Sequence, residues 1–168
     1  IVPTQDIVLG IYYMTKDDIE AKGAGKVFGS VEEARVAYDH DEVDLQAPIV
    51  VRYLDGLKYD TTMGRILLSE ILPDAIKFEA INKTLGKKEL GKLVDDTFRI
   101  AGAKETVLIA DALRSMGYRY STKAGLSIAI GDMVIPEGKD KLLDGAYDEV
   151  LKIKEQYSEG LLTEGERY

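Results

Sequence analysis

The chain has 168 residues, of which 30 are acidic and 22 are basic, so its formal net charge is −8 at pH 7. A body this acidic repels nucleic acid as a whole, and any contact with phosphate groups must therefore be local. The absence of cysteine excludes disulfides and thiolate metal sites, and no apolar run approaches the ~18 residues that a membrane-spanning helix requires.

The first element that the pattern predicts is a helix over residues 5–14. Thr4 is expected to cap it with its side chain, and Asp6 is favoured near the positive end of the helix dipole. The tract Lys22–Val27 contains two glycines and two lysines but lacks the spacing of a phosphate-binding loop. We interpret this tract as a flexible turn.

Acidic side chains dominate the next segment without forming a site. Ser30 and Glu33 have the spacing of a capping box, which predicts a short helix to about Tyr38. The residues from 39 to 44 bring several carboxylates together but lack a calcium-loop pattern, so we interpret them as a solvated loop. The single histidine, His40, has no serine or cysteine motif to pair with. His40 therefore gives no warrant for a catalytic triad, and we predict no metal site in this segment.

A β-hairpin is predicted next. The residues Pro48–Tyr53 are apolar and β-branched, Asp55-Gly56 is a strong turn signal, and Leu57–Asp60 is expected to pair back. Thr62 is then placed to cap a helix over residues 66–72, which must end before Pro73.

Two helices are predicted to follow, over residues 87–101 and 105–116. Gly102 is expected to stop the first helix, and the short link makes the two helices antiparallel neighbours. Val107 and Leu108 of the second helix are expected to be buried.

Residues 117–136 are interpreted as a junction between a helix that ends and a helix that begins. Gly117 is suited to the left-handed position that ends a helix, and the apolar run Leu126–Ile130 between glycines predicts a buried strand. Three cations crowd this stretch although the chain is acidic: Arg114, Arg119 and Lys123.

A long helix with a narrow apolar seam is predicted over residues 139–158. The seam residues recur at alternating spacings of three and four: Leu143, Ala146, Val150, Ile153 and Tyr157. Such a seam favours one partner helix, and the capping box Thr163–Glu166 begins one. The missing initiator methionine and this interrupted helix lead us to expect a piece of a longer protein.

Several blocks resemble the beta-prime subunit of bacterial RNA polymerase. Residues 3–15 read Pro-Thr-Gln-Asp-Ile-Val-Leu-Gly-Ile-Tyr-Tyr-Met-Thr, and residues 61–65 match the family's Thr-Thr-x-Gly-Arg block. Residues 117–133 resemble Gly-Phe-x-x-Ala-Thr-x-Ser/Ala-Gly-x-Ser-Ile-x-Ile-Asp-Asp-Met, with Gly131 in place of the first aspartate. Residues 160–168 resemble Gly-Leu-x-Thr-x-Gly-Glu-Arg-Tyr. The blocks follow the family order along the whole chain.

The resemblance implies two domains. Residues 1–136 correspond to the pore, or secondary-channel, domain, and residues 137–168 to the first rim helix and its tip. Together with the element pattern, the expected fold class is α+β: a mostly helical domain with a small β-hairpin, followed by a protruding long helix that is half of an antiparallel helical hairpin.

The resemblance also implies a function. The pore domain walls the channel through which nucleoside triphosphates enter and backtracked RNA leaves, and the rim docks factors of the Gre and DksA type. The resemblance also implies the beta, alpha, omega and sigma subunits as partners and no membrane partner. The implied location is the cytoplasm, at the bacterial nucleoid. The family's metal-binding loop Asn-Ala-Asp-Phe-Asp-Gly-Asp is absent from this sequence. The chain alone is therefore expected to be inert and to bind no cofactor, with Mg²⁺ held elsewhere in the polymerase.

Three groups of candidate site residues follow from the resemblance. Gln5 and Asp6 would lie nearest the active centre. The candidates for contact with phosphate groups or neighbouring elements of the channel are Arg65, Lys87, Lys88, Arg119 and Lys123. The candidates for factor docking at the rim tip are Glu164, Glu166 and Arg167. An alternative of another class is an independent α+β interaction module that binds a partner through its C-terminal helical arm.

Overall fold

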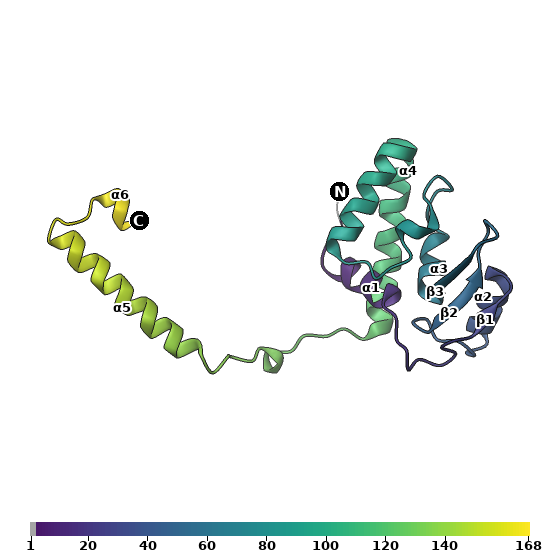
Figure 1. Ribbon diagram of the computed structural model, residues 1–168, viewed down its shortest axis with the longest axis horizontal. Coiled ribbons are helices and arrows are strands. Elements are labelled where there is room, and N and C mark those ends of the chain that lie inside the picture. The colour runs from purple at the N-terminus through teal and green to yellow at the C-terminus, as the bar shows by residue number, and fades with distance from the viewer. Residues whose placement is uncertain (1–2) are drawn as a thin grey trace. The chain divides into compact units, whose positions relative to one another are not determined.

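The computed structural model describes residues 3–168, and the chain divides into two compact units between Leu126 and Ser127. The first unit combines helices with one small sheet, and the second consists of helices, so the expected α+β class with a long C-terminal helix is confirmed (Figure 1). None of the helices in this part of the chain is both long and apolar enough to cross a lipid bilayer.

The first unit contains four α-helices, one 3-10 helix and three strands among its described residues. In chain order these are α1 (Asp6–Thr15), β1 (Val27–Phe28), α2 (Val31–Asp39), β2 (Pro48–Arg52), β3 (Lys58–Thr62), α3 (Met63–Ser69), the 3-10 helix η1 (Phe78–Ala80) and α4 (Lys87–Ala124). The strands lie in the order β1-β2-β3, with β1 parallel and β3 antiparallel to β2.

The predicted hairpin is present, and burial alternates along its first strand. Ile49 and Val51 are buried, whereas the residues between and after them are more exposed, as expected for a sheet with one face on a core. Two of the predicted caps are also confirmed, because Ser30 Oγ accepts a hydrogen bond from Glu33 N and Thr62 Oγ1 accepts one from Arg65 N.

The interpretation of residues 22–27 as a turn is confirmed for residues 22–25, whereas Val27 begins strand β1. The amide of Gly25 donates to the carbonyl of Pro48 at 2.7 Å, and the amide of Val50 donates to the carbonyl of Lys26 at 2.9 Å. These bonds hold the tract against β2. The pairing of β1 with β2 joins segments more than twenty residues apart in the sequence, so a local sequence pattern cannot predict it.

Glycines let two other helices, α3 and α4, approach the backbone of α1 closely. A Cβ added to Gly10 would lie 1.9 Å from the carbonyl oxygen of Gly117 in α4. A Cβ added to Gly64 in α3 would lie 1.8 Å from the carbonyl oxygen of Met14. Thr15 adds a polar link, since its Oγ1 accepts a hydrogen bond from the amide of Leu85 at 3.0 Å. The crossings with α3 and α4 therefore fix α1 on two sides.

Helix α4 breaks at Gly102, as predicted. Gly102 has φ 85° and ψ 179°, and the chain runs in opposite directions before and after it (Figure 1). The predicted end at Gly117 is wrong. The helix continues to Ala124 and is capped by Gly125 with φ 63°. Gly117 is instead a buried helical residue, because the crossing of α1 leaves no space for a side chain there.

Two further expectations about burial and strand structure are wrong. Val107 and Leu108 are each more than half exposed, because only the face of α4 that carries Ile109 and Leu113 turns to the core. The run Leu126–Ile130 forms no strand; its Ile130 is 94% exposed and begins the 3-10 helix η2 (Ile130–Asp132). Among the described residues the sheet has three strands and none comes from this run, so its backbone has no pairing partner.

The second unit contains the predicted long helix, α5 (Lys139–Ser158), followed by α6 (Glu164–Arg167). The capping box is confirmed: Thr163 Oγ1 accepts from Glu166 N, and Glu166 Oε2 accepts from Thr163 N at 2.9 Å. The Arg167 guanidinium lies 4.5 Å from the centre of the Tyr157 ring, which links the last residue of α6 to the seam of α5.

Candidate functional site

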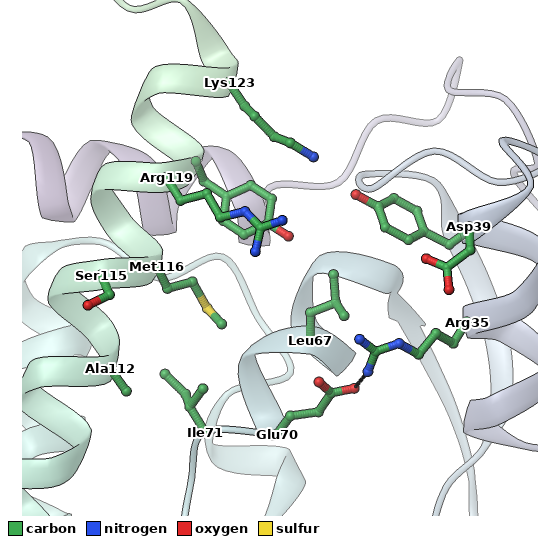
Figure 2. A pocket seen from close by; sticks show the side chains of 12 residues that line it. Arg35, Asp39, Leu67, Glu70, Ile71, Ala112, Ser115, Met116, Arg119 and Lys123 are labelled. Carbon is green, nitrogen blue, oxygen red and sulfur yellow. Dashed lines mark hydrogen bonds and ion pairs between the residues drawn. The ribbon is translucent and has the colours of Figure 1, made fainter.

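An open pocket of about 570 Å³ lies between α2, α3 and the second arm of α4 (Figure 2). Its lining mixes cations, phenols, two carboxylates and an apolar part. The lining residues are Arg35, Tyr38, Asp39, Leu67, Glu70, Ile71, Ala112, Ser115, Met116, Arg119, Tyr120 and Lys123. The pocket thus gathers two of the five predicted channel cations, Arg119 and Lys123.

Arg119 and Lys123 lie one helical turn apart on α4, a spacing that puts both side chains on one face. Figure 2 shows them extending into the pocket, towards the side on which α2 carries Arg35 and Asp39. Arg35 forms an ion pair with Glu70, whereas neither Arg119 nor Lys123 makes an ion pair with any residue in the described range 3–168. Their charge is therefore available to an incoming anion.

Tyr120 forms a buried wall beside these cations. Only 6% of its surface is exposed, and the ammonium of Lys123 lies 5.6 Å from its ring centre, within the range of a cation–π contact. Burial raises the pKa of Tyr120 to about 12, with a further contribution from the neighbouring Tyr38. At neutral pH the Tyr120 phenol stays uncharged, so it can donate or accept hydrogen bonds without adding negative charge to the pocket.

The packing of α1 determines where the pocket cations stand. Gly117 is in contact with α1 and precedes Arg119 by two residues on the same helix. The rigid crossing of α1 and α4 therefore fixes the backbone that carries both cations. This arrangement is suited to electrostatic attraction and orientation of an anionic group. The described residues contain no cluster of three or more His, Cys, Asp or Glu side chains arranged to hold a metal ion.

The predicted residues at the start of α1 lie outside this pocket. Gln5 and Asp6 are exposed, and Gln5 occupies the N-cap position with φ 51°, a strained value for a residue with a side chain. The expected side-chain cap by Thr4 is wrong: the helix start has no side-chain cap, and the Thr4 carbonyl accepts from Ile7 N at 3.3 Å. The proximity of Gln5 and Asp6 to an active centre stays a prediction.

The side chain of Arg65 is mostly buried and makes its contacts within the first unit. Its side chain is 11% exposed, its Nε donates to the carbonyl of Thr15 at 3.0 Å, and its Nη2 lies 3.4 Å from Asp17 Oδ1. Desolvation by burial lowers the pKa of Arg65, while Asp17 opposes this effect. Arg65 thus joins α3 to the C-terminal end of α1, where a cation is favoured by the helix dipole.

The other predicted residues are separate from the pocket as well. Lys87 and Lys88 are exposed in the first turn of α4. Glu164, Glu166 and Arg167 belong to α6 in the second unit. Hydrogen bonds from the backbone and side chain of Thr163 lower the pKa of Glu166, which shows a capping role for this carboxylate. Contact of these residues with phosphate groups or docking factors stays a prediction.

Sequence reasoning missed the half of the pocket that comes from α2 and α3. Arg35, Tyr38 and Glu70 carry no motif, and they reach α4 only through tertiary packing. The one local signal is the spacing of Arg35 and Tyr38, which places both on one side of α2.

The family described as RNA polymerase Rpb1, domain 3, matches residues 1–133. The matched region includes the whole sheet, both arms of α4 and every residue of the pocket.

Proposed function

We propose, from the premise that this chain belongs to the family RNA polymerase Rpb1, domain 3, that its first unit walls the channel that leads nucleoside triphosphates to the active centre. Membership makes the chain part of the largest subunit of a DNA-directed RNA polymerase, the nucleotidyltransferase of transcription. The alternative of a module unrelated to polymerase is therefore wrong. The finer assignment to the bacterial beta-prime subunit belongs to the proposal and rests on the motif blocks.

The observation that carries this proposal is the pair of unpaired cations in the pocket. The chain has a net charge of −8, so a triphosphate is repelled by most of its surface. Arg119 and Lys123 offer two positive charges to the pocket, and neither forms an ion pair with a carboxylate within residues 3–168. Two solvent-accessible cations on a rigid helix attract a multiply charged anion without holding it tightly, which suits passage through a channel. The same charges would meet the phosphates of backtracked RNA.

In this proposal the chain supplies a wall and local charge, and the chemistry lies elsewhere in the enzyme. Nucleotidyl transfer uses Mg²⁺, and the family's aspartate loop for that ion does not occur in this sequence. The chain alone is thus expected to make no RNA. The proposed partners are the remaining subunits, beta, alpha, omega and sigma, together with the triphosphates and the RNA 3′ end.

Steady-state elongation kinetics test the channel assignment. In the assembled polymerase, the double substitution Arg119→Gln and Lys123→Gln should raise the KM for the incoming triphosphate, by about threefold to tenfold for two exposed charges. The rate at saturating triphosphate should stay unchanged, and higher salt should shrink the difference. Lys104→Gln is the matched control, because Lys104 is an exposed cation of α4 outside the pocket. An equal KM in the double variant and the control would overturn the proposal.

The second unit is proposed to dock channel-entering factors of the Gre and DksA type. Its support is the exposed seam of α5, where Leu143 and Val150 are more than 40% exposed, and the start of a returning helix at Thr163. Binding of such a factor should be measured for this chain and for a chain extended beyond Tyr168. Binding by the extended chain alone supports the rim assignment, whereas no binding by two folded proteins contradicts it.

A further inference from the structure

A second hollow of about 790 Å³ lies beside the tip of the β2–β3 hairpin. Tyr53, Phe78 and several aliphatic side chains form most of its wall, and it shares with the channel pocket only Glu70. No step of the proposed function uses this groove. We call it the hairpin groove.

The aromatic wall of the hairpin groove is rigid. The rings of Tyr53 and Phe78 are stacked with their centres 4.2 Å apart, and Tyr59 packs edge-on against both. The hydroxyl of Tyr53 donates to Ser69 Oγ at 2.9 Å, and that oxygen in turn donates to the carbonyl of Ile66. A wall held in this way needs no reordering when a partner binds, which lowers the cost of association.

Two leucines stand exposed at the hairpin tip beside this wall. Leu54 is 78% exposed and Leu57 is 58% exposed, although both flank a tight turn in which polar residues are usual. The turn is well bonded: Leu57 N donates to Asp55 Oδ1, and Gly56 with φ 82° donates to the carbonyl of Tyr53. The leucines are thus presented outward by a fixed backbone, as an apolar anchor point would be.

Carboxylates surround this apolar surface. Asp55, Asp74 and Glu79 line the groove, against a single cation, Lys77. The hydroxyl of Tyr59 lies 2.7 Å from Asp55 Oδ2 and 2.9 Å from Glu79 Oε1, yet it has only one proton to share between them. The groove therefore carries uncompensated negative charge next to exposed apolar area. That combination repels nucleic acid and complements a polypeptide with basic side chains.

We propose that the hairpin groove docks a segment of another polymerase subunit in which apolar side chains are flanked by lysine or arginine. The apolar side chains of that segment pack on Leu54, Leu57 and the aromatic wall. Its basic side chains meet Asp55, Asp74 and Glu79 at the rim. The inference rests on membership in the polymerase and not on the channel assignment, so it stands or fails separately from the kinetics of Arg119 and Lys123.

Site-specific photocrosslinking in the assembled polymerase tests this inference. A benzophenone amino acid replaces Leu57, and the crosslinked peptide is identified by mass spectrometry; Val36 is the matched control, since it is an exposed apolar residue on α2 outside the groove. We expect the Leu57 probe to capture one peptide of another subunit that contains lysine or arginine beside apolar residues. No captured peptide, a peptide of the same subunit, or a peptide without basic residues would overturn the proposal.

A charge reversal, read out with the same Leu57 probe, tests the acidic rim separately from the apolar contacts. Asp74→Lys should lower the crosslinking yield at low salt, by up to about fivefold, the effect of one exposed ion pair. Glu20→Lys makes the same change of charge at an exposed residue outside the groove and should leave the yield unchanged. Equal yields from the two variants would contradict the role of the acidic rim.

Discussion

Replacing Gly10 with alanine places a methyl group 1.9 Å from the carbonyl oxygen of Gly117. Real Cβ atoms essentially never approach another atom closer than 3.0 Å, so α1 and α4 must separate by about 1 Å to accept the change. Neither contacting atom is the end of a flexible side chain. The strain therefore cannot be relieved by a change of rotamer.

The net effect follows from two opposing contributions. Alanine in place of glycine inside a helix contributes about 1 kcal/mol of helix propensity. Overpacking a well-packed contact costs about 1–3 kcal/mol, and more when backbone must move. The 1.9 Å approach puts Gly10→Ala at or above the upper end of this range, so we expect the unfolding free energy to fall by about 2 kcal/mol or more.

Urea denaturation followed by circular dichroism measures this loss. The matched control is Gly145→Ala, the same change inside α5, where an added Cβ has no other atom within 4 Å. The control should keep the denaturation midpoint of the first unit and increase helicity slightly. If Gly10→Ala unfolds at the same urea concentration as the unchanged chain, the argument that glycines set the α1–α4 crossing is refuted.

Two further predictions concern buried polar groups of the first unit. Arg65→Ala should lower the unfolding free energy by about 2 kcal/mol, because the Thr15 carbonyl loses a charged donor, and Asp17→Asn by less than about 1 kcal/mol, because Asp17 is exposed. Equal losses in urea denaturation would show that the surface ion pair, and not the buried hydrogen bond, stabilises this contact. Tyr120 should make stability fall at alkaline pH. Its folded pKa of about 12 exceeds the ordinary 10.0, so its contribution is complete below pH 10 and is lost as the pH rises to about 12. Tyr120→Phe should remove that part of the decline in the denaturation midpoint, and an unchanged decline in this variant would contradict the assignment.

Local signals in the sequence predicted the elements whose causes are local. The caps at Ser30, Thr62 and Thr163 are present because each side chain bonds an amide three residues ahead. The hairpin and the break at Gly102 follow in the same way from glycine at positive φ. These features need no information about distant parts of the chain.

The errors arise where a distant segment decides the outcome. The sequence around Gly117 resembles the end of a helix, which led to the wrong prediction. A glycine is required there because the backbone of α1 approaches α4 too closely for a side chain. Leu126–Ile130 has the composition of a strand but no described partner to pair with. The residues of the candidate site also fall into those that the sequence could indicate and those that only tertiary packing brings together. Arg119 and Lys123 could be selected from the sequence because they are cations in an acidic chain. Arg35 could not, because only the packing of α2 beside α4 brings it into the pocket.

The most direct test of the channel assignment is the path of backtracked RNA. A halted elongation complex carrying a photoreactive nucleotide at the RNA 3′ end is driven backwards by several nucleotides, and the crosslinked peptides are mapped. The account predicts crosslinks to the end of α4 that carries Arg119 and Lys123, and their loss in the double glutamine variant. Crosslinks that form efficiently in other parts of the polymerase and never reach this end of α4 would contradict it.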